Sequence, residues 1–214
     1  MALKNKSKSA ETRPVIYIID DEPTQREFCS LVLDTLGVEI IKSESVEQFL
    51  KVFQNESIGC ILSDVVMPGL SGSDFLEIAI KHNFRLPIIF FTAYANVDMA
   101  KSMLKKGAFD FLEKPINAEE LISSVRKAIA KSVTEKIQFD RELEVKNKVE
   151  RLTKREKQVL YLMLDGLSSS QISNELSIGE RTVETHRASI LKKFESKSFS
   201  ELTCNLIQIS GLNI

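Results

Sequence analysis

The feature that most constrains this chain is an apolar run that ends in a carboxylate and a sharp turn. Residues 58–62 are apolar or small, Asp64 follows closely, and a turn containing Pro68 and Gly69 comes next. A short apolar run between turn signals predicts a buried strand, and open α/β sheets keep their functional groups at the carboxyl ends of such strands. Asp64 is therefore expected at the functional edge of a parallel sheet.

Further apolar runs also end in polar residues: 15–19 before Asp20 and Asp21, 87–91 before Thr92, and 109–113 before Lys114. Each acid alone could simply cap the helix that follows it. Three carboxylates at one sheet edge would repel each other, however, and a divalent cation with oxygen ligands relieves such repulsion. A carboxylate nucleophile, a metal, a hydroxyl and an ammonium together indicate a site that handles phosphoryl groups.

Helical periods alternate with these runs, near residues 25–36, 46–53, 73–81 and 97–106, and a weaker strand is expected at 38–42. Five strands alternating with helices predict an α/β fold with a doubly wound, five-stranded parallel sheet. A flavodoxin-like or nucleotide-binding enzyme is the alternative for this half. Such an enzyme needs a turn rich in Gly, Ser or Thr after the first strand to bind phosphate, whereas the turn here is Asp20-Asp21-Glu22-Pro23.

In this order and spacing, the first half resembles the receiver domain of two-component response regulators. The resemblance covers residues 14–130 and rests on Asp20-Asp21, Asp64 with Met67-Pro68-Gly69 and Gly72, Thr92-Ala93, Gly107-Ala108, Phe111 and Lys114-Pro115. It implies the flavodoxin-like receiver fold. It also implies that Asp64 accepts a phosphoryl group from a sensor histidine kinase.

The same resemblance assigns roles to the residues around Asp64. It implies that Mg²⁺ is held by Asp21 and Asp64, by Asp20 through a water molecule, and by the carbonyl of Val66. It further implies a phosphate-binding and switching set made of Thr92, Phe111 and Lys114.

Composition bounds the rest of the chain. With 214 residues and 43% apolar content, two small domains are the natural expectation. No apolar run approaches the roughly 18 residues of a membrane span, and the first residues lack an apolar signal core, so a cytoplasmic protein without a membrane partner is expected. Residues 14–130 hold seventeen acidic and eleven basic residues, and 151–214 hold nine basic and seven acidic ones. This asymmetry fits a signal-receiving domain joined to an anion-binding one.

Two segments flank the first domain. Residues 1–13 are polar and aperiodic, and we expect a disordered N-terminus. Residues 131–150 are mostly charged, without Gly or Pro, and carry Glu144 and Lys148 four residues apart. They predict a helical linker continuous with the helix that begins near Asn117, and a flexible charged linker is the alternative.

The last segment, 151–214, reads as short helices separated by capping signals. Thr153-Lys-Arg-Glu156 and Ser168-Ser-Ser-Gln171 have the form of capping boxes, and together with the glycine at 166 they predict an all-helical bundle. The segment resembles the LuxR-type helix-turn-helix domain of the NarL/FixJ response regulators, closest to the FixJ branch. The matching motifs are Leu152-Thr-Lys-Arg-Glu156, Gly166-Leu-Ser168, Leu176-Ser-Ile178 and Thr182-Val-Glu-Thr-His-Arg187.

Residues 180–194 form the expected recognition helix. Its apolar residues, Val183, Ile190, Leu191 and Phe194, share one face that must pack inward. The outward face is expected to contact DNA, and with the resemblance it gives the set Thr182, Glu184, Thr185, His186, Arg187, Ala188 and Lys192, together with Lys197 beyond the helix. Lys193 also suits a phosphate contact. A solvated amphipathic helix would show the same periodicity, and the resemblance favours DNA binding.

These observations predict a transcriptional regulator that is controlled by phosphorylation and is not an enzyme, because no residues indicate a substrate pocket beyond Asp64. Its expected partners are a sensor histidine kinase, a second copy of the chain after phosphorylation, and double-stranded DNA with a palindromic promoter site. The alternative is a protein-interaction module, controlled by phosphorylation, whose helical bundle binds a protein partner.

Overall fold

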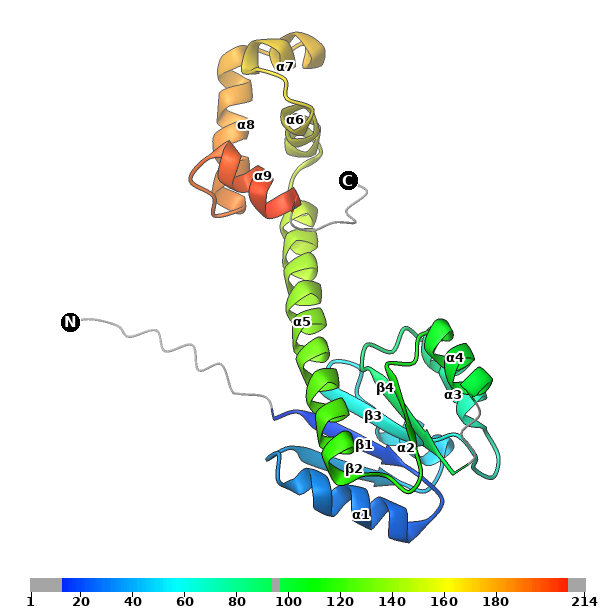
Figure 1. Cartoon of the computed structure of the whole chain (residues 1–214). Coiled ribbons are helices and arrows are strands. Elements are labelled where there is room, and N and C mark those ends of the chain that lie inside the picture. The colour runs from blue at the N-terminus through cyan, green and yellow to red at the C-terminus, as the bar shows by residue number, and fades with distance from the viewer. Residues whose placement is uncertain (1–12, 94–96, 208–214) are drawn as a thin grey trace, which may run out of the picture. The chain divides into compact units, whose positions relative to one another are not determined.

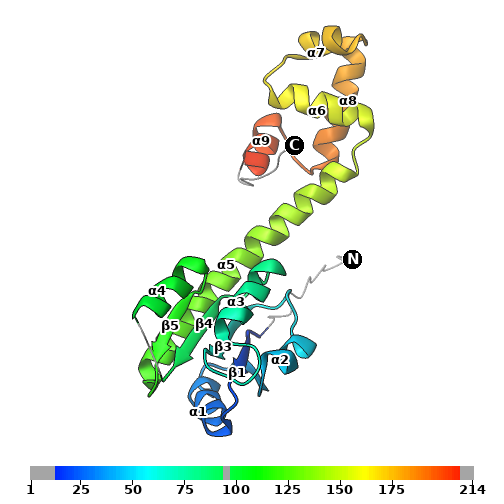
Figure 2. The ribbon, with the colours of Figure 1, turned by 90° about the vertical axis from the view of Figure 1, so that its right-hand side faces the viewer.

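The computed structural model describes residues 13–93 and 97–207 and divides the chain into two compact units, with the division between Lys136 and Ile137. Figures 1 and 2 show the ribbon of the whole chain from two sides. The expected disordered segment 1–13 falls almost entirely outside the described residues.

The first unit is built on five strands: β1 Val15–Ile19, β2 Glu39–Ser43, β3 Gly59–Asp64, β4 Ile88–Thr92 and β5 Asp110–Glu113. Its helices are α1 Pro23–Asp34, α2 Val46–Val52, α3 Gly72–Lys81, α4 Val97–Lys106 and the first part of α5, which runs from Ala118 to Glu150. All strand pairs are parallel, and the spatial order is β2-β1-β3-β4-β5. The predicted fold class is confirmed.

Both faces of this sheet are covered, which explains why β1, β3 and β4 are buried at every position and mostly apolar. In β1, Tyr17 and Ile19 pack with side chains of α2, α3 and α4, whereas Ile16 and Ile18 pack with side chains of α1 and α5. Helices therefore lie on both sides of the sheet, as doubly wound folds require. Cys29 and Cys60 are buried in the second of these layers, where burial raises the pKa of each thiol to about 12 and keeps it protonated.

The second unit contains four further helices: α6 Lys154–Leu164, α7 Ser169–Leu176, α8 Glu180–Lys193 and α9 Phe199–Ile207. Both predicted capping boxes are present. The side chains of Thr153 and Ser168 each accept a hydrogen bond from the backbone N–H three residues later, and the side chains of Glu156 and Gln171 accept from the backbone N–H of Thr153 and Ser168. These caps fix where α6 and α7 begin.

The last turns of α5 pack into the core of this second unit. Val145 and Val149 contact the apolar cluster formed by α6, α8 and α9. Lys148 pairs with Glu144 at 2.7 Å, as the spacing predicts, and with Glu195 at 3.2 Å. The expected domain boundaries at 130 and 150 stay predictions, since the division between the compact units falls inside α5.

Within the described ranges, no helix is both long enough and apolar enough to cross a membrane.

Candidate functional site

The carboxyl ends of β1 and β3 bring the two buried carboxylates together. The strands are in register with Ile19 opposite Ser63, so Asp20 and Asp64, which come one residue later, lie side by side. Asp20 is fully buried and Asp64 is 6% exposed. Asp21 points away from the core and is exposed, yet one oxygen of each of the three carboxylates lies within 4.8 Å of the others. The predicted convergence of three acids is therefore present.

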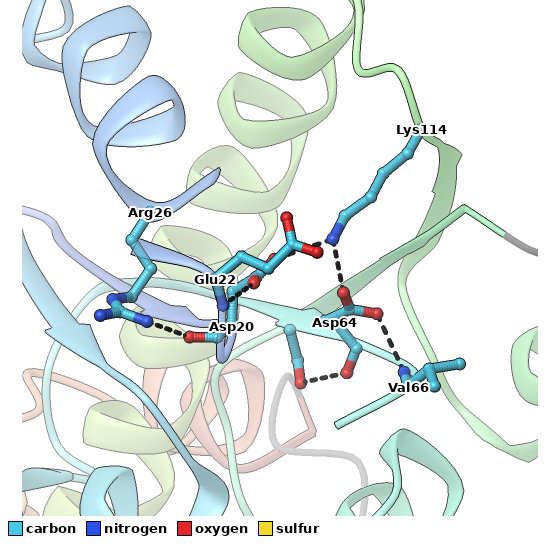
Figure 3. Close-up of polar contacts among 7 residues, drawn as sticks. Asp20, Glu22, Arg26, Asp64, Val66 and Lys114 are labelled. Atoms are coloured by element: carbon cyan, nitrogen blue, oxygen red, sulfur yellow. Dashed lines mark hydrogen bonds and ion pairs between the residues drawn. The ribbon is translucent and has the colours of Figure 1, made fainter. Parts of the chain in front are cut away.

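Lys114 joins the two buried carboxylates. Its Nζ donates to Asp64 Oδ2 at 2.5 Å and to Asp20 Oδ2 at 2.9 Å, as Figure 3 shows. The side chain is only 10% exposed, and Nζ also lies 5.1 Å from the centre of the Phe91 ring. This arrangement holds a single ammonium against two carboxylates from neighbouring strands.

Backbone N–H donors bind the remaining oxygens of the two buried carboxylates. The Glu22 N–H donates to Asp20 Oδ1 at 2.7 Å, and the Val66 N–H donates to Asp64 Oδ1 at 2.9 Å. Arg26 donates to the backbone carbonyl of Asp20 at 2.5 Å, which secures the turn between β1 and α1. Each buried carboxylate thus has both oxygens bonded and a single orientation.

Burial and charge act on the site in opposite directions. Burial raises the pKa of Asp20 above its ordinary value, although the hydrogen bonds from Lys114 and Glu22 partly oppose this. Burial would lower the pKa of Lys114, but its bonds to Asp64 and Asp20 outweigh that effect and raise it. Three carboxylates facing one ammonium leave an excess of negative charge.

The donor set fits Mg²⁺. Octahedral Mg²⁺ takes oxygen ligands at about 2.1 Å, so oxygens around it are about 3–4 Å apart. The carboxylates of Asp20, Asp21 and Asp64 need only a small contraction to reach that spacing. A divalent cation would also offset the excess negative charge.

A cavity of about 450 Å³ opens beside Asp64. Two residues of the expected phosphate-binding set, Thr92 and Lys114, line it, together with Val66 and Gln25. Thr92 is 1% exposed at the end of β4. Phe111 does not line this cavity: it is partly buried against the layer formed by α2, α3 and α4.

The predicted recognition helix, α8, has the orientation that the sequence indicates. Val183, Ile190 and Phe194 are buried, and Leu191 is partly buried in the same cluster. Residues on the opposite side are exposed, namely Thr182, Glu184, Thr185, Ala188 and Lys192, as is Lys197 beyond the helix. Gly179 occupies the N-cap of α8, and no side chain caps this helix.

Three basic or imidazole side chains of the predicted set lie deeper than the rest. His186 and Arg187 are half-buried, and the guanidinium of Arg187 lies over the Phe199 ring at 5.8 Å. Lys193 donates to Glu156 at 2.6 Å. The ammonium of Lys193 is therefore already paired within the unit, and the phosphate contact expected of it stays a prediction.

Glu156 is the residue of this unit whose importance the sequence did not reveal. It is 4% exposed and accepts from Lys193 and Ser189 of α8, each at 2.6 Å, and from the Thr153 N–H at 2.7 Å. Burial alone would raise its pKa, but these bonds dominate and lower it to about 2. The capping-box position was visible in the sequence, whereas the bonds to α8 depend on the tertiary fold.

Comparison with known proteins gives two family matches. Residues 16–126 match the response regulator receiver domain, and residues 150–206 match the bacterial regulatory proteins of the luxR family. The transcriptional regulatory protein FixJ of Azorhizobium caulinodans is 34% identical over 192 residues, which cover 90% of each chain. The response regulator protein TodT of Pseudomonas putida is 35% identical over 188 residues, covering 88% of this chain and 83% of that protein.

Solved structures give the same result. The response regulator StyR has a TM-score of 0.83 and 30% identity, with 92% of this chain and 99% of that chain covered. Full-length FixJ from B. japonicum has a TM-score of 0.56 and 32% identity, with 94% and 100% covered.

Proposed function

Because the chain belongs to the response regulators that join a receiver domain to a LuxR-type DNA-binding domain, we propose that phosphorylation of Asp64 controls its binding to DNA. The observation that carries this proposal is the pairing of Lys114 with both Asp20 and Asp64 beside an open cavity. The chain then acts as a regulator rather than an enzyme, and Asp64 receives its phosphoryl group from a sensor histidine kinase.

The transfer itself requires little from the protein beyond positioning and charge. A carboxylate oxygen of Asp64 attacks the phosphorus of the phosphohistidine, a P–O bond forms, and the P–N bond breaks with its electron pair remaining on the imidazole nitrogen. The product is an acyl phosphate. Lys114 and Thr92, which line the cavity, are placed to bind the oxygens of the phosphoryl group as charge gathers on them.

Asp20, Asp21 and Asp64, with the carbonyl of Val66, would hold Mg²⁺, which when bound neutralises charge between the carboxylates and the incoming phosphoryl group. The fully buried Asp20 keeps the set in place through its bonds to Glu22 and Lys114. The exposed Asp21 is the carboxylate that can adjust to the ion.

We propose that the signal reaches the DNA-binding unit through a homodimer. Thr92 and Phe111 lie at the end of β4 and in β5, next to α4, and a shift of either side chain would alter that surface. One helix-turn-helix contacts one half-site, so two joined copies bind a palindromic site with a high effective concentration for the second contact.

A gel shift with the full-length protein and genomic fragments tests the proposal. We expect treatment with a small phosphodonor and Mg²⁺ to raise affinity for particular fragments by at least about tenfold, together with a monomer-to-dimer change in sedimentation. The Asp64→Asn protein, treated identically, should show neither change. Protein capture without any DNA shift would instead support the alternative of a protein-interaction module.

Side chains on the exposed face of α8 should divide into two groups. Lys192→Ala should weaken binding to all duplexes alike and reduce the slope of log affinity against log salt by about one unit, because one phosphate contact is lost. Thr185→Ala should instead relax sequence preference. The Thr185 hydroxyl donates to the Arg181 carbonyl at 2.9 Å, which leaves its methyl group to contact a thymine.

Lys127→Ala is the matched control for Lys192→Ala, since it removes the same charge from an exposed position in the receiver unit. It should leave the salt slope unchanged. The assignment of the face fails if Lys192→Ala alters sequence preference while Thr185→Ala weakens all duplexes equally.

A further inference from the structure

A hydrogen bond on the exposed face of α8 joins this helix to α7 and was not predicted from the sequence. The hydroxyl of Ser169, the first residue of α7, donates to Oε1 of Glu184 in α8. Glu184 is an exposed acidic residue of this face and lies one turn after Glu180, the acidic residue of the first turn of the helix. An acidic side chain in that place must approach the negative phosphates of DNA, so its orientation matters more than that of its neighbours.

The elements that bear the two residues are held firmly. Ser168 caps α7: its Oγ accepts from the Gln171 N–H at 3.3 Å, and its own N–H donates to Gln171 Oε1 at 2.8 Å. At the other end of α7, the Ser173 hydroxyl donates to the Ile178 carbonyl at 2.8 Å. These bonds fix the position of Ser169 relative to the turn that leads into α8.

Packing fixes the distance between the two helices. Ile172, one turn after Ser169, and Val183, which precedes Glu184, are both fully buried in the same apolar cluster. The backbones of α7 and α8 therefore cannot separate without opening that core. The contact between Ser169 and Glu184 lies at the outer edge of a rigid pair of helices.

We propose that Ser169 is a positioning residue that orients Glu184 to read cytosine, an inference that rests on the proposed DNA binding. The hydroxyl occupies Oε1, and Oε2 stays available to accept a hydrogen bond. In the major groove cytosine presents only the N4 amino donor, whereas adenine adds the N7 acceptor, and guanine and thymine present acceptors that repel a carboxylate.

The contact gains strength in the complex. A hydrogen bond between an exposed hydroxyl and a carboxylate is weak in water, because water competes for both groups. When α8 enters the groove, water is displaced and the bond to the ionised oxygen becomes stronger. Ser169 also withdraws part of the negative charge from the side of Glu184 that faces α7.

The test uses the full-length protein, activated with a small phosphodonor and Mg²⁺, and a pool of randomised duplexes. The duplex that the wild type enriches most is then varied base by base, and the position at which Glu184→Ala loses its preference is the position that Glu184 reads. We expect cytosine there. Ser169→Ala should reduce the preference for cytosine over thymine at that position by about three- to tenfold and leave every other position unchanged.

Two variants separate positioning from folding. Ser169→Thr keeps the hydroxyl and should restore the preference, whereas Ser170→Ala removes an exposed hydroxyl from the adjacent residue and should change nothing. The salt slope should be the same for all of these proteins, because no phosphate contact is altered.

Several results would overturn the inference. A preference at the Glu184 position that is equal in Ser169→Ala and the wild type, or a loss of affinity spread over all positions, removes Ser169 from recognition while leaving DNA binding intact. A preference there for guanine or thymine rejects cytosine as the base read. A wild type that enriches no sequence defeats the proposed DNA binding itself, and this inference with it.

Discussion

Asp64→Asn should abolish phosphorylation of this protein by small phosphodonors. The wild type, incubated with acetyl phosphate and Mg²⁺, should gain the mass of one phosphoryl group, because Asp64 is the carboxylate of this site that both bonds to Lys114 and lines the cavity. An amide is not a nucleophile of this kind, so the variant should gain nothing. Intact-protein mass spectrometry measures both results.

Two controls make the experiment specific. Asp34→Asn changes an exposed carboxylate in α1 of the same unit and should be phosphorylated as the wild type is. Chelating the divalent cation should remove the signal from both proteins, because the negative charge of the three carboxylates then opposes the phosphoryl group. A mass gain that persists in Asp64→Asn, or that appears without the cation, would disprove the assignment.

Glu156→Ala should destabilise the DNA-binding unit by roughly 2–3 kcal/mol. The change removes three hydrogen bonds to a buried carboxylate and leaves the Lys193 ammonium, which is 33% exposed, without its partner. The cost is moderated because Lys193 can turn towards water. Calorimetry of the full-length protein should show one transition lowered by about 10 °C, and the other, from the receiver unit, serves as an internal reference.

The stabilisation by Glu156 should depend on pH in a defined window. Its pKa is lowered from an ordinary value of 4.5 to about 2, so its contribution is complete above about pH 4.5 and is lost as the pH falls towards 2. The difference in unfolding free energy between the wild type and Glu156→Gln should shrink over that interval. Glu175→Ala, an exposed acid in α7, should show little difference from the wild type at any pH. A difference in unfolding free energy between the wild type and Glu156→Gln that stays constant from pH 6 to 3 would contradict the role given to this carboxylate.

The strands of the receiver unit could be predicted because burial on both faces demands uninterrupted apolar runs. The weakest prediction was β2, an edge strand in which only Ser43 is fully buried, and it begins one residue later than expected. The first helix starts at Pro23 rather than near Gln25, because proline at the first helical position favours a helix start that periodicity does not detect. The convergence of Asp20, Asp64 and Lys114 could be predicted from the strand ends, since the parallel topology gathers them at one edge.

Two contacts that the sequence did not reveal join helices within the second unit. Glu156 and Lys193 are 37 residues apart, and Ser169 and Glu184 are 15 apart. Periodicity reports which face of a helix is buried, but it does not report which polar groups meet where two helices cross. Lys193 shows the consequence, because its position near an exposed face suggests a DNA contact, whereas its ammonium also pairs with an acid from another helix.

The packing of Val145 and Val149 against the DNA-binding helices limits where recombination can join this DNA-binding domain to a different receiver domain. The family match for the second domain begins at residue 150, yet the core that supports α8 extends back to Val145, about one and a half turns into α5, and the Lys148 bridge to Glu195 lies in the same stretch. A gene fusion joined at residue 150 would replace those side chains with foreign ones and uncover the apolar cluster. Recombination that preserves a working output module should therefore cross over upstream of Val145, inside the helix rather than at its end.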